Sequence, residues 1–194
     1  KHVYPGPSPE PADIASLIEE EGVTLTAGVP TVWLGLLEYA KDNEVDLSSL
    51  ERIIIGGSAA PKSVIKQFDE QYDVEVLHAW GMTEMSPLGT VANLKPELED
   101  LPAEERYAKQ AKQGLLVPGL EMKVLDDDGE EVPWNGEDFG ELLVRGPWVT
   151  KEYFGRPDAN EEDFEDGWLR TGDVVTVDED GYIKIVDRAK DVIK

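Results

Sequence analysis

The stretch from His78 to Glu84 brings together three side chains that could act on a ligand. Trp80 offers a flat indole face for a base or another ring. Thr83 and Glu84 offer oxygen ligands of the kind that a hard cation such as Mg²⁺ binds. Gly81 breaks the preceding apolar run and predicts a tight turn from which these side chains emerge. Taken alone, a packed Trp beside a solvated Thr–Glu pair is the simpler explanation.

A second candidate segment, 56–61, has the sequence Gly-Gly-Ser-Ala-Ala-Pro and carries no charged side chain for acid–base chemistry. Its small residues would let a ligand lie against the backbone, whose N–H and C=O groups could bind the edge of an adenine. The segment lacks the Lys-Ser/Thr ending of a phosphate-binding P-loop. A tight strand-to-helix turn without a ligand explains it at least as well.

A third candidate is the Arg-Thr-Gly-Asp sequence at 170–173. Asp173, leaving a Gly turn, is suited to accept both hydroxyls of a ribose, although an Asp that only stabilises its own turn is common. Two Asp-rich turns, 126–129 and 178–181, lack the full ligand spacing of a calcium loop, so ordinary hairpin turns are favoured there. His78 has no second His or Cys nearby, which favours a partly buried neutral imidazole over a metal ligand.

A strand–loop–helix–strand unit predicts how the first two segments come together. The apolar run 53–55 is typical of a strand buried on both faces of a parallel sheet. A helix over about 61–72 then leads into a second strand at 74–78. If the crossover is right-handed, both strands end at the same edge of the sheet. Segments 56–61 and 78–84 should therefore lie side by side, in the crevice where open α/β sheets bind ligands.

The remaining pattern predicts an α/β fold: a doubly wound sheet portion followed by a small β-barrel-like subdomain. Helices are predicted from Pro11 and from Pro30, with a strand between them, and a short helix begins at Pro102. Further strands are predicted at 122–125, 141–145, 174–177 and 182–186, the last two forming a hairpin. We expect an α/β subdomain over 1–114, a β-rich subdomain over 115–187 and a charged link over 188–194.

The composition excludes several classes of partner. With 42 acidic and 18 basic residues, the net charge of −24 would repel nucleic acid and anionic membranes. The 40% of hydrophobic residues and five Trp indicate a packed core instead of a disordered acidic tail. We hypothesise adaptation to high salt, which screens self-repulsion. No apolar run approaches the roughly 20 residues of a membrane span, and the absence of Cys excludes disulfides. We expect a fragment of a longer protein, because the sequence lacks an initial Met and stops within an apolar–basic alternation.

Five segments, taken in order, resemble the motif series of the adenylate-forming enzymes, the superfamily of acyl-CoA synthetases, adenylation domains and firefly luciferase. Their sequences are Gly-Gly-Ser-Ala-Ala-Pro, His-Ala-Trp-Gly-Met-Thr-Glu, Gly-Glu-Leu-Leu-Val-Arg-Gly, Arg-Thr-Gly-Asp and Asp-Arg-Ala-Lys-Asp. The resemblance extends from about residue 23 to the end, and the sequence around Trp80 is most similar to that of medium- and long-chain fatty acyl-CoA synthetases. It implies that a carboxylate attacks ATP to give acyl-AMP and pyrophosphate, and that the CoA thiol then displaces AMP.

The resemblance also implies a role for each matching residue. Thr83 would contact the phosphate and Glu84 would hold Mg²⁺, which makes these two the catalytic residues. The other roles would be an adenine border of Ser58, Ala59, Ala60 and Pro61, stacking by Trp80, His78 near the acyl carboxylate, Asp173 and Arg188 on the ribose, and Lys190 as the hinge of a C-terminal lid.

The implied ligands are ATP, Mg²⁺, CoA and a fatty acid, in a cytoplasmic enzyme that the resemblance allows to be a homodimer at full length. The family's phosphate loop and its catalytic lid lysine have no counterpart in this sequence. We therefore expect the fragment alone to be inactive. Two alternatives stay open: an adenylation domain that loads a carrier protein, and a non-catalytic nucleotide-binding module.

Overall fold

A computed structural model describes residues 1–188. The chain forms two compact units. The first unit consists of Lys1–Ala79 and Asn93–Ala111. The second begins with Trp80–Ala92 and resumes at Lys112. These units group residues by proximity; whether 1–114, 115–187 and 188–194 are separate subdomains of the whole protein stays a prediction.

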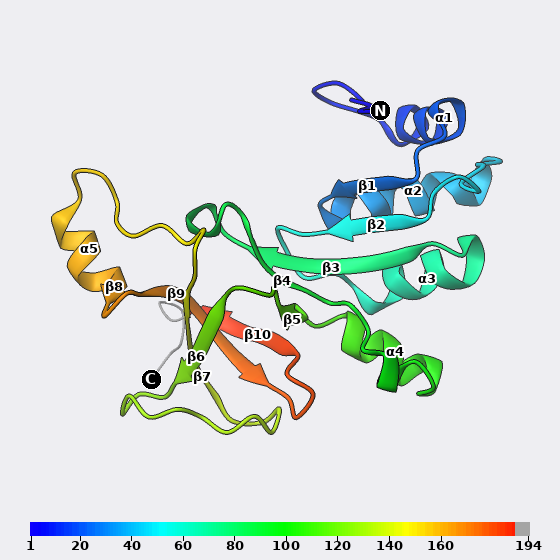
Figure 1. Cartoon of the computed structure of the whole chain (residues 1–194). Coiled ribbons are helices and arrows are strands. Elements are labelled where there is room, and N and C mark those ends of the chain that lie inside the picture. The colour runs from blue at the N-terminus through cyan, green and yellow to red at the C-terminus, as the bar shows by residue number, and fades with distance from the viewer. Residues whose placement is uncertain (189–194) are drawn as a thin grey trace. The chain divides into compact units, whose positions relative to one another are not determined.

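The first unit is built on a parallel sheet of three strands in the order β1-β2-β3 (Figure 1). The strands are β1 (Leu25–Gly28), β2 (Arg52–Ile55) and β3 (Glu75–Gly81), whose last two residues belong to the second unit. The helices are α1 (Pro11–Glu21), α2 (Pro30–Asp42), α3 (Lys62–Tyr72) and α4 (Ala103–Gln110), with a 3₁₀ turn η2 (Pro96–Leu98). The predicted strand–loop–helix–strand unit is confirmed, because β2 and β3 are parallel neighbours.

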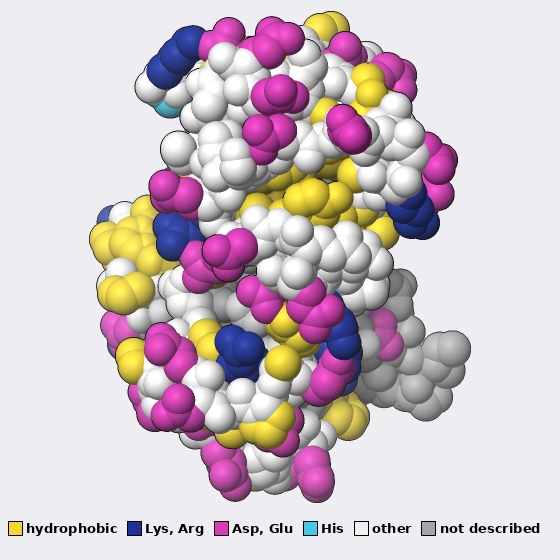
Figure 2. Space-filling view, turned by 90° about the vertical axis from the view of Figure 1, so that its right-hand side faces the viewer, with side chains coloured by type: hydrophobic (Ala, Val, Ile, Leu, Met, Phe, Trp, Pro, Cys, Tyr) yellow, Lys and Arg dark blue, Asp and Glu magenta, His cyan; other side chains and the backbone are white. Residues whose placement is uncertain are grey.

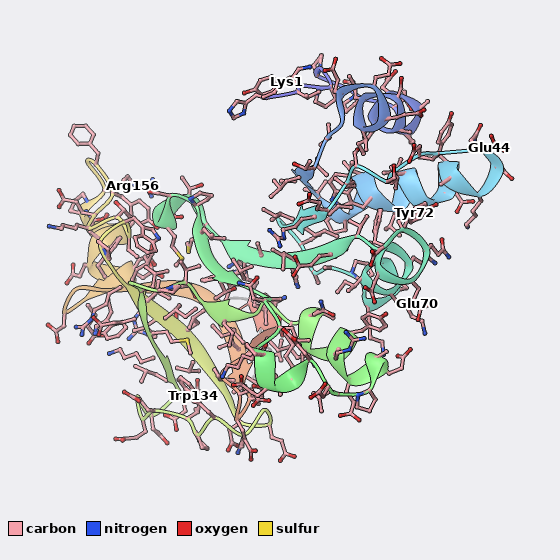
Figure 3. The ribbon with its side chains drawn as sticks, turned by 45° about the vertical axis from the view of Figure 1, so that its right-hand side comes forward. Lys1, Glu44, Glu70, Tyr72, Trp134 and Arg156 are labelled. Carbon is pink, nitrogen blue, oxygen red and sulfur yellow. The ribbon has the colours of Figure 1, made fainter. Side chains whose placement is uncertain are left out.

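Local sequence explains where the helices begin and end. Pro11 and Pro30 are first helical residues, where a missing N–H costs nothing. Gly22 ends α1 in the left-handed conformation at φ 60°. In α3, one face carries the buried side chains of Val64, Ile65 and Phe68. These pack with the other core side chains of the unit, among them Trp33, Leu36, Ile53 and Ile55. Figure 3 labels Glu70 and Tyr72, which lie at the end of α3.

Strand β3 is longer than the sequence predicted. It continues through Trp80 to Gly81 instead of ending at His78. Gly81 is needed for close packing and not for a tight turn, since a Cβ there would lie 1.8 Å from the carbonyl oxygen of Pro87. That approach lets the N–H of Met82 donate to the same oxygen at 2.9 Å.

The second unit is β-rich (Figure 1). Its main sheet has the order β10-β9-β7-β6, with antiparallel neighbours, and β8 pairs with β9. The elements are η1 (Thr83–Met85), β4 (Leu88–Val91), β5 (Leu115–Leu116), β6 (Glu121–Leu125), β7 (Phe139–Arg145), α5 (Pro157–Asp163), β8 (Phe164–Glu165), β9 (Trp168–Val177) and β10 (Ile183–Arg188). The α/β fold class followed by a β-rich part is confirmed, whereas β4, α5 and β8 were not predicted. Leu142, Val144, Leu169, Val175 and Val177 are among the buried side chains that form its core.

The acidic residues are spread over the surface. On the face shown in Figure 2, Asp and Glu side chains are scattered instead of gathering in one patch. Within residues 1–188, no helix combines the length and the apolar composition that crossing a membrane would require.

Candidate functional site

Asp173 is set in an irregular part of a strand, not after a Gly turn between elements as the sequence suggested. Gly172 lies in the middle of β9 with φ 69°, where the pairing of β7 with β9 changes register. The Thr171 hydroxyl holds this bulge, because its Oγ1 donates to the carbonyl of Leu142 at 2.8 Å and accepts the N–H of Asp173 at 3.1 Å. A bulge re-aims the side chains next to it, and here it fixes the direction of one carboxylate.

The Asp173 carboxylate is held from two sides. The residue is only 5% exposed. Its Oδ1 accepts a hydrogen bond from Nη1 of Arg188 at 2.7 Å, and its Oδ2 accepts one from Nε1 of Trp80 at 3.0 Å. A buried carboxylate requires such partners, since burial without them is costly. The Arg188 side chain is 60% exposed, so this arrangement is open to solvent on the guanidinium side.

Trp80 is fixed by packing as well as by its hydrogen bond. A Cβ added to Gly89 in β4 would lie 2.5 Å from Cζ3 of the Trp80 ring. The ring therefore occupies space that only a glycine leaves free. Gly89 is a site residue that sequence reasoning missed, because nothing in its local pattern shows which side chain approaches it.

Glu84 lies on η1 and has its own partner. The Tyr153 hydroxyl donates to Oε1 of Glu84 at 2.8 Å. Burial raises the pKa of Tyr153 to about 12, and the neighbouring Glu84 carboxylate acts in the same direction. The phenol thus stays protonated and able to donate near neutral pH. Thr83, one residue before Glu84, is exposed.

Tyr153 is itself clamped in place. Asn160 of α5 accepts the N–H of Tyr153 at 2.6 Å and donates to its carbonyl at 3.0 Å. The ring of Phe164 meets the Tyr153 ring edge-on, with centroids 5.5 Å apart. Sequence reasoning missed Tyr153 and Asn160, since 69 residues separate Tyr153 from Glu84 along the chain.

The first unit holds the Gly56–Pro61 loop beside His78. The Ala60 N–H donates to Nε2 of His78 at 3.4 Å, and Nδ1 of His78 lies 3.1 Å from the carbonyl of Ala111. One ring nitrogen accepts and the other donates, which assigns the neutral imidazole that the sequence favoured. Ser58 and Ala59 are exposed, Ala60 is buried and Pro61 caps α3. The loop is thus beside the His78 end of the stretch, as predicted.

The Asp-rich turns stabilise their own backbone. Oδ1 of Asp126 accepts the N–H groups of Asp128 at 3.0 Å and Glu130 at 2.9 Å. Oδ1 of Asp178 likewise accepts two N–H groups of its own turn at 3.0 Å. Across residues 1–188, no group of three or more His, Cys, Asp or Glu residues could hold a metal ion. A Mg²⁺ ion at Glu84 would fit only together with other oxygen ligands, such as the phosphates of a bound nucleotide.

Two further features lie outside the candidate site. A hollow of about 1050 Å³ in the second unit lies at the β6–β7 loop, and its lining includes Asp126, Glu137, Glu141 and Arg170 but neither Trp80 nor Asp173. Arg170 is engaged there, because it pairs with Glu141 at 2.7 Å. The hollow is therefore separate from the candidate site residues. The predicted hinge residue at position 190 lies outside the described residues.

Comparisons with known proteins identify relatives of the whole chain. The profile of the AMP-binding enzyme family matches residues 1–154. The chain is 48% identical over 192 residues to a 3-methylmercaptopropionyl-CoA ligase of Ruegeria lacuscaerulensis, covering 99% of the chain and 35% of that protein. It is 45% identical over 195 residues to a long-chain-fatty-acid–CoA ligase of Thermus thermophilus, covering 100% and 36%.

A solved structure of another coenzyme A synthetase is also similar to this chain. O-succinylbenzoate coenzyme A synthetase from Bacillus subtilis, in complex with ATP and a magnesium ion, superimposes with a TM-score of 0.78 at 31% identity. The match covers 94% of this chain and 35% of that one. The chain thus spans about a third of the length of the proteins it matches.

Proposed function

Because the chain belongs to the family of AMP-binding, adenylate-forming enzymes, we propose that it is the central part of an ATP-dependent acid–CoA ligase acting on a medium- or long-chain fatty acid. In the proposed reaction, a carboxylate oxygen attacks the α-phosphate of ATP and pyrophosphate leaves. The CoA thiol then attacks the acyl carbon, and AMP leaves as the thioester forms. We also propose, as the family resemblance implies, that the enzyme is cytoplasmic.

The observation that carries the proposal is the Asp173 carboxylate, held between Arg188 and Trp80. Two carboxylate oxygens offer about four acceptor positions. The two hydrogen bonds, at 2.7 and 3.0 Å, leave capacity for the hydroxyls of a ribose. Arg188 would orient this carboxylate, so that the ribose meets a preorganised acceptor.

Glu84 and Thr83 supply the phosphate side of the proposal. Glu84 would hold Mg²⁺, which when bound would neutralise charge on the phosphates. Tyr153 donates to one oxygen of Glu84 and so limits the directions in which that carboxylate can turn. The exposed hydroxyl of Thr83 would donate to a phosphate oxygen.

The remaining roles are proposals for single residues of each unit. The exposed backbone at Ser58 and Ala59 would lie along the adenine edge, and Trp80 would stack on its face. His78, 2% exposed and hydrogen-bonded through both ring nitrogens, would form a neutral wall near the acyl carboxylate. Lys190 would be the hinge of the lid.

The test uses the whole protein with ATP, Mg²⁺, fatty acids of graded length and free CoA. We expect pyrophosphate release that depends on the fatty acid, followed by thioester formation. Thioester formation only on a carrier protein would favour the adenylation-domain alternative. If no carboxylic acid stimulates pyrophosphate release, the ligase proposal is refuted and a non-catalytic module is favoured. The 194-residue chain alone is expected to form no thioester.

An Asp-to-Asn pair of variants tests the ribose assignment. Asp173→Asn is expected to raise the KM for ATP by about tenfold or more, because hydrogen bonds to charged groups contribute roughly 1.5–3 kcal/mol. Asp126→Asn is the matched control, since Asp126 only caps its own exposed turn. Equal effects of the two substitutions on KM would contradict the assignment.

A further inference from the structure

The strand β10 contains a bulge that determines which residue faces Asp173. Before the bulge, Ile185 pairs with Val175 of β9. After it, Asp187 pairs with Val174 and Arg188 pairs with Asp173. One extra residue, Val186, is therefore inserted in β10 between these pairs.

Without this bulge, a negative side chain instead of a positive one would lie opposite Asp173. Continuing the register of Ile185 with Val175 would place Asp187 opposite Asp173. Two carboxylates directly opposite each other destabilise a strand pair, and a slip of one residue also moves side chains to the other face of the sheet. The pairing of Arg188 with Asp173 thus depends on the position of the bulge.

Gln113 holds the backbone of β10 immediately before the bulge. Its N–H donates to the carbonyl of Ile183 at 2.9 Å, and Gly114 accepts the N–H of Ile183 at 2.9 Å. The amide oxygen of the Gln113 side chain then accepts the N–H of Ile185 at 2.7 Å. A side chain therefore supplies the acceptor that a longer neighbouring strand would have supplied through its backbone.

Gln113 is itself rigidly placed. It is 6% exposed, and the hydroxyl of the fully buried Thr90 donates to its carbonyl at 2.5 Å. Gly114 follows with φ 96°, where a Cβ would lie 2.2 Å from the backbone of β4. On the other side, Lys112 pairs with Asp178 at 2.5 Å. Because Gln113 is fixed in this way, its side-chain oxygen holds the N–H of Ile185 at one position.

We propose that Gln113 is a positioning residue of the ribose site, which fixes the β10 bulge through the N–H of Ile185 and thereby sets Arg188 against Asp173. The inference rests on the proposed function, because it concerns the site assigned there to the ribose. Among the described hydrogen bonds, Gln113 makes none to the side chains of Asp173 or Arg188. Its effect passes through three residues of backbone.

The test compares ATP with 2′-deoxyATP in the whole protein. A site built to bind a hydroxyl discriminates against the analogue that lacks it. Gln113→Met keeps the side-chain length but removes the acceptor oxygen. We expect it to reduce the ratio of kcat/KM for ATP to that for 2′-deoxyATP by about tenfold, the effect of roughly one lost hydrogen bond to a charged group.

Two further variants separate positioning from general stability. Gln113→Glu retains an acceptor oxygen in either protonation state and is expected to keep most of the discrimination. Gln71→Met, at an exposed position of α3, makes the same chemical change without that contact and should leave the ratio unchanged. If Gln113→Met lowers kcat/KM for both nucleotides by one factor, or changes neither, the inference is wrong.

Hydrogen exchange provides a readout that needs no activity. In the whole protein, Gln113→Met should speed amide exchange of residues 185–188 by about tenfold, while exchange in β6 stays unchanged. Unchanged exchange at 185–188 would overturn the inference. An inactive wild-type protein whose β10 responds in this way would refute the proposed function but leave the structural role of Gln113 standing.

Discussion

The indole N–H of Trp80 can be removed without removing its flat ring, through the substitution Trp80→Phe. In the structure this N–H donates to Oδ2 of Asp173 at 3.0 Å. The Asp173 side chain is 8% exposed, so water cannot readily replace the lost donor. We therefore expect both the stability of the protein and the affinity for ATP to fall, although a ring remains for stacking.

The expected magnitude follows from the two partners of Asp173. A hydrogen bond to a charged group contributes roughly 1.5–3 kcal/mol. The remaining partner, Arg188, already donates to the other oxygen, Oδ1, at 2.7 Å, so it compensates little for the donor lost at Oδ2. Trp80→Phe should thus lower the free energy of unfolding by about 2 kcal/mol.

Equilibrium unfolding of the whole protein in urea measures this change. Trp134→Phe is the matched control, because Trp134 lies on the loop between β6 and β7 and is 50% exposed (Figure 3). Surface substitutions of this kind change stability by less than about 0.5 kcal/mol. Equal effects of the two Trp→Phe substitutions would refute the reasoning.

A double-mutant cycle assigns the effect to the pair. If the lost stability comes from the bond to Asp173, Trp80→Phe should cost much less in a protein that already carries Asp173→Asn. Additive effects of the two substitutions would show that Trp80 acts through packing alone.

Two other predictions rest on side-chain contacts, and a third rests on the net charge. Tyr153→Phe should raise the Mg²⁺ concentration needed for half-maximal activity by several-fold, because Glu84 loses a hydrogen-bond donor. In an absorbance titration, the variant should also lack one phenol that ionises near pH 12. An unchanged Mg²⁺ requirement would argue against this role of Tyr153. Hydrogen-bonded ion pairs with Lys66 and Lys62 of α3 lower the pKa of Glu104 from 4.5 to about 2, so their small contribution to stability is present above pH 4.5 and is lost as the pH falls toward 2. The difference in melting temperature between wild type and Glu104→Gln should therefore shrink over that interval. A constant difference would contradict the assignment. The folded fraction measured by circular dichroism should rise between low and multimolar KCl if the net charge of −24 reflects adaptation to salt, and a flat response would exclude that hypothesis.

Local patterns in the sequence were sufficient to predict much of the first unit. The apolar run at Ile53–Ile55, the prolines at helix starts and the 3.6-residue spacing in α3 are each determined by nearby residues, and the structure confirms them. The same holds for the hairpin of β9 and β10, whose turn chemistry is local.

What the sequence could not predict depends on contacts between distant segments. The Gly172 sequence indicates a turn, but pairing with β7 on one side and β10 on the other extends β9 through it. Gly89 is explained only by the Trp80 ring that approaches it, and Gln113 only by the N–H of Ile185. These features follow from packing and register, which no short window of sequence contains.

Formation of an acyl adenylate by the whole protein is the proposed step to which the site residues are assigned, and exchange of labelled pyrophosphate into ATP measures this step. We predict exchange that requires both a fatty acid and Mg²⁺, and that falls by at least tenfold in Glu84→Gln, since the amide is a poor ligand for Mg²⁺. Glu99→Gln, at an exposed position, is the control and should retain exchange. Exchange that is absent from the wild-type protein with every fatty acid tried, or that survives Glu84→Gln unchanged, would contradict the account.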